Sequence, residues 1–263
     1  MSELIISTYL VGLIYFITLW LLSLLTKKSS VIDIGWGFFF SVISVFYILY
    51  YQLILSLEHK IALALVVLWS CRLGIYLLIR YLHENEEDKR YAKLKKKWNA
   101  TQFSFIKMFV FQGFIASSMS FPFYLIYSRD ITINNLFYAG IIIGIISLFL
   151  ESIADYQLFS FKKKPSNKGK VLNNGLWHLS RHPNYFFEWM VWVSIGLICL
   201  SLKGNAYIGI YAPTFMYITL NHLSGIPFLE EKARQGIYTK EGEEKYYKTT
   251  PAFFPNILKL IHK

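Results

Sequence analysis

Long apolar runs alternate with short polar connections along most of this chain. A transmembrane helix needs roughly 20 mostly apolar residues, because each residue rises about 1.5 Å and the hydrocarbon layer is about 30 Å thick. The runs are continuous and do not alternate residue by residue, so they predict helices and not the strands of a membrane barrel. Segments that reach or approach the required length cover residues 4–25, 36–55, 61–82, 105–127, 135–161, 184–202 and 205–221.

This pattern predicts an all-α fold, a polytopic membrane helical bundle of about seven transmembrane helices. The seventh segment is the weakest, because it is short and contains Pro213. No long polar linker separates the runs, which predicts a single integral membrane domain over residues 1–263 with a tail from about residue 222. The composition agrees, since 55% hydrophobic and 16% charged residues leave more apolar surface than a soluble core can bury.

Lys and Arg gather in alternate connections, namely those after the first, third and fifth segments, and in the tail. The remaining connections hold only Lys60, Arg129 and Lys203. Positive residues beside membrane spans are retained in the cytoplasm, so we expect an outside N-terminus and a cytoplasmic C-terminus in a multi-pass membrane protein. The same rule accounts for the net charge of +11, and nucleic-acid binding is not indicated.

Two arrangements imitate known sites but lack the rest of the pattern. His178 and His182 have a spacing that suits two ligands on one helix face, but Pro183 disfavours helix at His182 and no third ligand is evident. Gly35 and Gly37 follow no strand and lack the third glycine of a dinucleotide-binding loop. The two cysteines stand in different predicted helices, and we expect no metal site.

Ionisable residues inside apolar runs are candidates for function, because a charge at membrane depth is costly unless it faces protein, water or a partner. The fifth segment carries a stripe of small and acidic residues spaced by three or four, hence on one helix face. Small residues allow a neighbouring helix to approach closely. The stripe consists of Gly140, Gly144, Ser147, Glu151 and Asp155. The acids either serve a ligand or pair with the following lysines, Lys162 and Lys163.

The sixth segment opens with the sequence SRHPNYFFEW. Pro183 suits the first turn of a helix, and Asn184 and Glu188 are four apart and share a face. The helix N-terminus favours an anion, and Arg181 and His182 add donors there. The alternative is a capped helix with an interfacial arginine.

Asp33, Arg72 and Arg80 are further ionisable residues in apolar surroundings. Asp33 either forms an ion pair with Arg72 or takes part in chemistry, and both uses remain open.

Several segments, taken in this order, resemble the DUF1295 family, bacterial membrane relatives of the steroid 5-alpha-reductases, and the resemblance implies a multi-pass protein of the bacterial inner membrane. The similarity covers nearly the whole chain. The segments that carry it are DIGWG from Asp33, RLGIYLLIR from Arg72, QG at Gln112, ADYQLFSF from Ala154, GLWHLSRHPNYFFE from Gly175, SGIPFLEE from Ser224 and YYKTTPAFFP from Tyr246.

The resemblance implies a membrane reductase that uses NADPH to reduce a carbonyl-conjugated carbon-carbon double bond of a lipid or steroid-like substrate. It implies that Tyr76 binds the substrate carbonyl, and Asp33 is retained beside it as a catalytic candidate. The residues expected at the cofactor, from the resemblance and from the basic and acidic stretches described above, are Glu151, Asp155, Lys162, Arg181, His182, Asn184, Tyr185, Glu188, Glu230 and Glu231.

The chain departs from the steroid reductases in two places. Phe187 replaces a glycine of the family's NYFGE pattern, and the Gln-Glu-Leu-Pro segment of the second helix is absent.

RHPNY followed by a Glu-Glu pair and a Tyr-rich tail is also similar to the isoprenylcysteine and phospholipid methyltransferases, which use S-adenosylmethionine. A dinucleotide carries phosphate charges and requires Lys or Arg, whereas the methyl donor carries none. The basic residues from Lys162 to Arg181 favour the dinucleotide, although topology also accounts for them. A non-catalytic lipid-binding protein is the third alternative.

Overall fold

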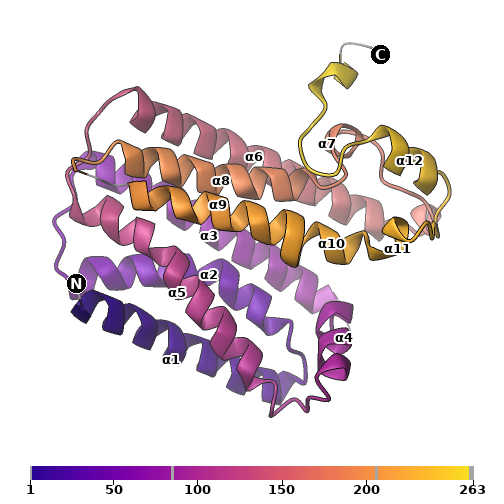
Figure 1. The fold of residues 1–263 in the computed structure, drawn as a ribbon, viewed down its shortest axis with the longest axis horizontal. Coiled ribbons are helices and arrows are strands. Elements are labelled where there is room, and N and C mark those ends of the chain that lie inside the picture. Colours follow the sequence, from indigo (N-terminus) through magenta and orange to yellow (C-terminus); the bar gives the residue numbers. More distant parts are fainter. Residues whose placement is uncertain (1, 84–85, 205–206, 261–263) are drawn as a thin grey trace. The chain divides into compact units, whose positions relative to one another are not determined.

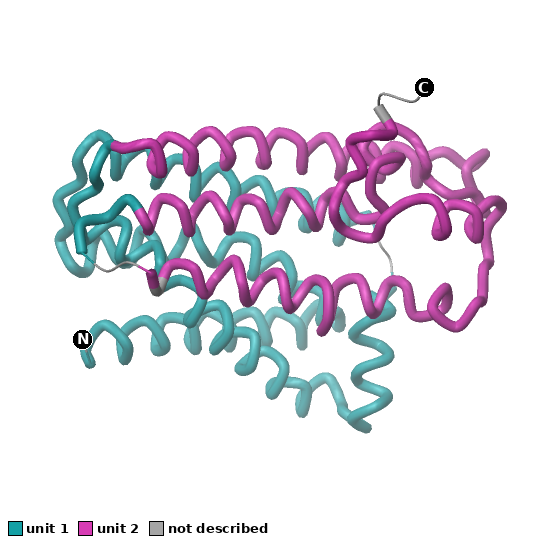
Figure 2. The backbone as a smooth tube through the Cα atoms, turned by 45° about the horizontal axis from the view of Figure 1, so that its top comes forward, with its two compact units in different colours: residues 1–133, 201–206 teal, residues 134–200, 207–263 magenta. Residues whose placement is uncertain are grey.

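The computed structural model describes residues 2–83, 86–204 and 207–260, and within these ranges the chain is helical, with two isolated bridges and no β-strand. The chain folds into two compact units, shown in different colours in Figure 2. Unit 1 comprises residues 1–133 and 201–206, and unit 2 comprises residues 134–200 and 207–263.

The described residues of unit 1 form four long helices and one short helix. They are α1 (Ser2–Thr26), α2 (Val31–Tyr50), α3 (Leu57–His83), α4 (Lys89–Lys97) and α5 (Ile106–Ser128), labelled in Figure 1. Helix α1 packs against α5 and α2, and α2 packs against α3. Glycines permit the closest approach, because a Cβ atom on Gly37 of α2 would lie 2.6 Å from the backbone of Gly74 on α3.

Hydroxyl groups connect these helices inside the apolar core of unit 1. The buried hydroxyl of Tyr47 on α2 forms hydrogen bonds with Thr8 of α1 at 3.1 Å and with Ser120 of α5 at 2.7 Å. Each partner satisfies a polar group that would otherwise be buried in an apolar environment. The network thereby ties three helices together at one level.

Unit 2 is built on α6 (Asn135–Lys163) and α8 (Pro183–Leu200), which pack against each other. Near the start of α6, a Cβ atom on Gly140 would lie 2.9 Å from the carbonyl oxygen of Ser194, and near its end Asp155 contacts Asn184. The two helices are therefore antiparallel. The shorter elements of the unit are η1 (Pro165–Asn167), α7 (Leu176–Leu179), η2 (Tyr207–Ile210), α9 (Tyr211–Ile218), η3 (Thr219–Leu223), α10 (Ile226–Leu229), α11 (Glu231–Arg234), α12 (Glu243–Thr249) and η4 (Ile257–Leu260).

Six helices of the described residues are long and apolar enough to cross a membrane, as expected for a multi-pass membrane protein: α1, α2, α3, α5, α6 and α8. Residues 205–206 of the predicted seventh span lie outside the described residues, and the rest of that span consists of three pieces, a 3₁₀ turn, α9 and a π turn. Pro213 in the first turn of α9 has no N–H to donate to an earlier carbonyl, and a 3₁₀ turn stands before that helix. The number of spans and the orientation of the termini stay predictions.

The second span begins earlier than its apolar run. Helix α2 starts at Val31, five positions before the predicted boundary, so Asp33 lies in its first turn. An acidic side chain is favourable there because the helix N-terminus carries a partial positive charge. The helix ends at Tyr50, and Gln52 follows with a positive φ of 50°. The apolar residues 53–55 therefore lie beyond the helix.

Candidate functional site

Polar side chains of α6 and α8 meet near the C-terminal end of α6. The amide Nδ2 of Asn184 donates a hydrogen bond of 3.1 Å to Oδ1 of Asp155. Glu188 follows Asn184 by four residues on α8, and its Oε1 accepts a hydrogen bond of 3.1 Å from the indole of Trp192. Asp155 and Glu188 are buried, with 4% and 8% of their surfaces exposed. We call Glu151, Asp155, Asn184 and Glu188 the helix-pair cluster.

The predicted stripe on α6 is the face that this helix buries. Its five members are all buried, and Glu151 is 2% exposed. Because the antiparallel helices meet at Gly140 with Ser194 and again at Asp155 with Asn184, Glu151 stands at about the level of Glu188. The small residues permit the packing, and the acids lie one to two turns further along the same face.

A second group lies just before α8, around Arg181. Its guanidinium forms two hydrogen bonds of 2.8 Å with the two carboxylate oxygens of Glu230 and also donates to the carbonyl oxygens of Tyr247 and Thr250. Nε2 of His182 lies 2.8 Å from Oε1 of Glu230. We call Arg181, His182 and Glu230 the Arg181 clasp. Both basic side chains expected to attract an anion thus share one internal carboxylate.

The pKa of Glu230 reflects this environment. Burial raises the pKa of the carboxyl, but hydrogen bonds from His182 and Arg181 and their charges more than offset that effect, and the pKa falls from 4.5 to about 2. Glu230 is therefore ionised at neutral pH, and its side chain is 5% exposed. This is the arrangement of a closed ion pair between the α10 segment and the start of α8.

The C-terminal segment covers the connection that leads into α8. The Tyr246 hydroxyl donates to the carbonyl oxygen of Trp177 at 2.5 Å, and Ser180 donates to the carbonyl oxygen of Phe253 at 2.9 Å. Lys259 donates to the carbonyl oxygen of His178 at 3.0 Å. The Ser180 hydroxyl oxygen also accepts a hydrogen bond of 3.2 Å from the backbone N–H of His182.

The other predicted cofactor residues of unit 2 are less enclosed. Tyr185 is half-buried and its ring stacks on that of His182, with the centroids 5.7 Å apart. Lys162 and Glu231 are exposed. Lysines also surround η1, and Lys163, Lys164, Lys168 and Lys170 are exposed as well.

The two catalytic candidates belong to unit 1. Asp33 accepts hydrogen bonds of 2.5 Å from Arg90 and from Tyr91, and Arg80 lies 3.6 Å away. The sequence analysis considered Arg72 as the ion-pair partner of Asp33. In the structure, Arg80 and Arg90 lie beside its carboxylate. Tyr76 is half-buried on α3, with the Arg72 guanidinium 5.8 Å from its ring centroid. These contacts favour a structural use for Asp33.

The family described as a protein of unknown function, DUF1295, matches residues 19–250. This chain belongs to the DUF1295 family. A protein from Ustilaginoidea virens named "Probable O-methyltransferase ustE" is 38% identical to this DUF1295 protein over 92 residues, which are 35% of the chain and 31% of the relative. The match thus spans about a third of the relative's length. No solved structure matches the chain.

The DUF1295 protein also has an apolar groove along α8, within unit 2, that the sequence did not predict. The groove has a volume of about 520 Å³, and Leu200 at the end of α8 is among its lining residues. Aromatic residues gather around Trp189, whose indole donates to the carbonyl oxygen of Pro213 at 3.0 Å. The groove is lined by Trp189, Val193, Gly196, Leu197, Leu200, Ile210, Pro213, Thr214, Tyr217 and Phe254.

The sequence contained partial signals for the residues that were missed. Trp192 follows Glu188 by four positions, the spacing at which two side chains meet on a helix. Tyr246, Tyr247 and Thr250 belong to the closing motif of the family resemblance, but their contacts with residues 177–181 bridge about 70 positions. No local pattern connects residues so far apart.

Proposed function

We propose that this DUF1295 protein is a membrane methyltransferase that uses S-adenosylmethionine and methylates a lipid-soluble acceptor. The name of the Ustilaginoidea virens relative supports methyl transfer over the matched third of that protein. The similarity of RHPNY and the Glu-Glu pair to lipid methyltransferases supports the same reaction class. The apolar groove of about 520 Å³ in unit 2 supports an acceptor with an apolar body.

One observation favours S-adenosylmethionine over a nicotinamide dinucleotide as the cofactor. The buried charged groups of the helix-pair cluster are carboxylates, and the basic side chains of the clasp, Arg181 and His182, both bind Glu230. A carboxylate-rich site attracts a cation and repels phosphate. S-adenosylmethionine carries a sulfonium and an ammonium group, whereas a nicotinamide dinucleotide carries several phosphate charges. The buried carboxylates therefore fit S-adenosylmethionine better than they fit a nicotinamide dinucleotide.

The helix-pair cluster would hold this cofactor through its acceptor groups. When bound, S-adenosylmethionine supplies an electrophilic methyl group on a positively charged sulfur. Asn184 orients the Asp155 carboxylate through its hydrogen bond, and Trp192 does the same for Glu188. Carboxylates held in this way accept hydrogen bonds from ammonium and ribose hydroxyl groups without losing further side-chain freedom.

Binding of S-adenosylmethionine to the purified protein in detergent, measured by calorimetry, tests this proposal. Glu188→Gln keeps the shape and removes a charge-assisted contact worth about 1.5–3 kcal/mol, so its affinity should fall about tenfold to 150-fold. Tyr156→Phe is the matched control, because Tyr156 is 70% exposed on α6 beside Asp155. Normal binding by Glu188→Gln, or no binding by the unaltered protein, would contradict the proposal.

A reductase remains the second candidate, on the observation that Asp155, Asn184 and Glu188 lie together. They are three of the residues expected at the cofactor, and the Asn184–Asp155 hydrogen bond connects two of them across the helix pair. NADPH fits less well, because the clasp already pairs the nearby basic side chains. In this reading Tyr76 would bind the substrate carbonyl.

One titration series distinguishes the methyltransferase from the reductase. The unaltered protein is titrated with S-adenosylmethionine and, in a parallel sample, with NADPH, and its melting temperature is followed, since a ligand that binds only the folded state stabilises it. Stabilisation by S-adenosylmethionine alone supports the methyltransferase. Stabilisation by NADPH alone replaces it with the reductase.

A further inference from the structure

Hydroxyl groups inside the helices of this DUF1295 protein repeatedly donate to the carbonyl oxygen four residues earlier. Thr214 donates to the carbonyl oxygen of Ile210 at 3.0 Å, and Thr249 donates to that of Lys245 at 2.9 Å. Ser152 does the same on α6. A hydroxyl bonded in this way needs no further partner inside an apolar helix bundle.

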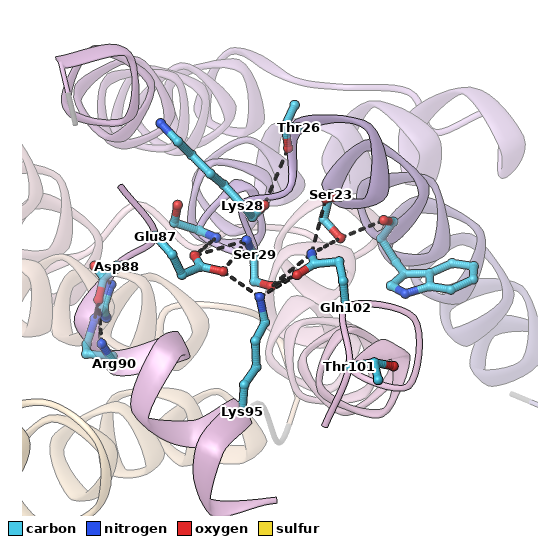
Figure 3. A network of polar contacts seen from close by, with 12 residues as sticks. Ser23, Thr26, Lys28, Ser29, Glu87, Asp88, Arg90, Lys95, Thr101 and Gln102 are labelled. Carbon is cyan, nitrogen blue, oxygen red and sulfur yellow. Dashed lines mark hydrogen bonds and ion pairs between the residues drawn. The ribbon is translucent and has the colours of Figure 1, made fainter. Parts of the chain in front are cut away.

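Polar side chains that connect different elements are satisfied as well. Figure 3 shows this in unit 1, where the side-chain amide of Gln102 donates to the hydroxyl oxygens of Ser23 and Ser29 at 3.0 and 3.1 Å. The side-chain oxygen of Gln102 accepts from the ammonium group of Lys95, which also lies 2.6 Å from Glu87. Because a buried polar group without a partner is destabilising, an exception to this rule calls for an explanation.

Thr219 of unit 2 is such an exception. Its Oγ1 atom is buried, and among the described residues it has no hydrogen-bond partner. The backbone at Thr219 is helical, with φ −61° and ψ −48°, so a bond to the carbonyl oxygen of Phe215 is geometrically open to the hydroxyl. Thr214 makes the equivalent bond on the same helix, and Thr219 does not. The π turn over Thr219–Leu223 begins at this residue, and such turns are frequent at functional sites.

The packing of α9 beside α8 gives the level of Thr219 within unit 2 (Figure 1). A Cβ atom on Gly196 would lie 3.3 Å from Cγ of Pro213, and the ring centroids of Trp189 and Tyr217 lie 5.7 Å apart. As α9 advances, its partners on α8 therefore go back toward the start of that helix, and the two helices are antiparallel. Thr219 follows Tyr217 by two residues, or about 3 Å, and so reaches the level of the first two turns of α8.

The helical spacing gives the side to which Thr219 belongs. Thr219 follows Met216 by three positions and Ala212 by seven, so it lies on their buried side of α9. The groove-lining residues occupy the opposite side of α9. Asn184 and Glu188 likewise lie off the groove-lining stripe of α8. The Thr219 hydroxyl and the helix-pair cluster therefore share one level of unit 2 and the side of the α8–α9 pair that faces away from the groove.

The donors beside the helix-pair cluster are already engaged by its carboxylates. Asn184 donates to Asp155, and Trp192 donates to Glu188. S-adenosylmethionine ends in an amino acid, whose ammonium group these carboxylates attract and whose carboxylate they repel. The carboxylate of the cofactor therefore requires a separate donor. The Thr219 hydroxyl is a buried donor at the right level, with no partner among the described residues.

We propose that Thr219 is a further cofactor-binding residue, whose hydroxyl donates to the amino-acid carboxylate of S-adenosylmethionine. The inference rests on the proposed methyltransferase function. It accounts for the exception described above, because a hydroxyl that bonded the Phe215 carbonyl oxygen would not be available to a ligand. The two charged groups of the amino acid would then be bound by different elements, the ammonium group by α6 and α8 and the carboxylate at the π turn.

The test measures the affinity of the purified full-length protein in detergent for S-adenosylmethionine by calorimetry. Thr219→Val keeps the shape of the side chain and removes the hydroxyl, so its affinity should fall about tenfold to 150-fold, the range for a hydrogen bond to a charged group. Thr219→Ser retains the hydroxyl and should retain most of the affinity. Without ligand, the melting temperature of Thr219→Val should equal or exceed that of the unaltered protein, because an unsatisfied buried polar group is removed.

Two analogues identify the part of the cofactor that Thr219 binds. S-adenosylhomocysteine retains the amino-acid carboxylate, whereas methylthioadenosine lacks the whole amino-acid end. Thr219→Val should weaken the binding of S-adenosylhomocysteine as much as that of S-adenosylmethionine and leave the binding of methylthioadenosine unchanged. An equal loss for methylthioadenosine would show that the hydroxyl contacts the nucleoside, and it would overturn the assignment to the carboxylate.

Thr249→Val is the matched control, because it makes the same change at an exposed hydroxyl that is bonded to the carbonyl oxygen of Lys245. Its affinity for S-adenosylmethionine should equal that of the unaltered protein. Unchanged affinity in Thr219→Val, or a lower melting temperature of this variant without ligand, would overturn the role of Thr219 and leave the methyltransferase in place. No binding by the unaltered protein would contradict the methyltransferase itself, and the role of Thr219 with it.

Discussion

The amide of Asn184 donates to the carboxylate of Asp155 at 3.1 Å, and this contact joins the beginning of α8 to the end of α6. Asn184→Ala removes a donor from a buried carboxylate, so we expect a loss of about 1–3 kcal/mol in the free energy of unfolding. In a double-mutant cycle, Asn184→Ala with Asp155→Ala should cost less than the sum of the single variants. Melting curves in detergent measure all three. Strict additivity would show that the contact contributes nothing.

Arg181 and Glu230 form a buried ion pair with two parallel hydrogen bonds of 2.8 Å. Glu230→Gln leaves Arg181 buried with an incomplete partner, and breaking such a pair costs about 3–5 kcal/mol. Arg181→Lys should also be destabilising, because an ammonium group cannot reproduce the fork that binds Glu230 and the two carbonyl oxygens.

An exposed pair provides the control for the Arg181 clasp. Glu244 and Lys248 are four residues apart on α12 at 2.6 Å, with more than half of each side chain exposed. Glu244→Gln should leave the melting temperature nearly unchanged, because surface ion pairs contribute little. Equal shifts for Glu230→Gln and Glu244→Gln would contradict the importance of burial at the clasp.

The lowered pKa of Glu230 predicts how stability depends on pH. The folded-state pKa is about 2 and the ordinary value is 4.5, so the native state binds its proton more weakly than the unfolded state. This contribution is present above pH 4.5 and is lost as the pH falls from 4.5 toward 2. Melting temperatures of the unaltered protein should therefore fall more steeply over this range than those of Glu230→Gln. Parallel curves would show that another group controls the acid transition.

The close approach of α6 and α8 predicts that Gly140 resists substitution. A Cβ atom there would lie 2.7 Å from Cγ1 of Ile198 and 2.9 Å from the carbonyl oxygen of Ser194. Gly140→Ala should destabilise the protein by about 1–3 kcal/mol through overpacking. Gly196→Ala is the milder control, because its Cβ would be 3.3 Å from Cγ of Pro213, a side-chain atom. A larger effect at Gly196 would contradict this packing.

The orientation in the membrane is a prediction from the distribution of Lys and Arg, and labelling of single cysteines tests it. Introduced at Lys203, whose side chain is 70% exposed, a cysteine should react with an impermeant reagent in intact cells. Cysteines at Lys96 and Lys168, both exposed, should react only after permeabilisation. The native Cys71 and Cys199 are replaced beforehand. The reverse pattern would invert the topology.

The sequence by itself determined the helical class, the family and the buried face of α6. Each of these depends on residues close together in the chain, either as apolar runs of about 20 residues or as positions spaced by three and four. The five residues of the α6 stripe are all buried for this reason. The exact ends were less predictable, because apolar residues such as those at 53–55 continue past the helix.

Only the tertiary structure decided the partners of the charged residues. Glu230 lies 49 positions from Arg181, and Arg90 lies 57 positions from Asp33. Charge attraction has no sequence period, so each carboxylate had several basic candidates in the sequence, and helix packing selected among them. This selection changed the interpretation of Arg181 from an anion-binding residue to part of an internal clasp.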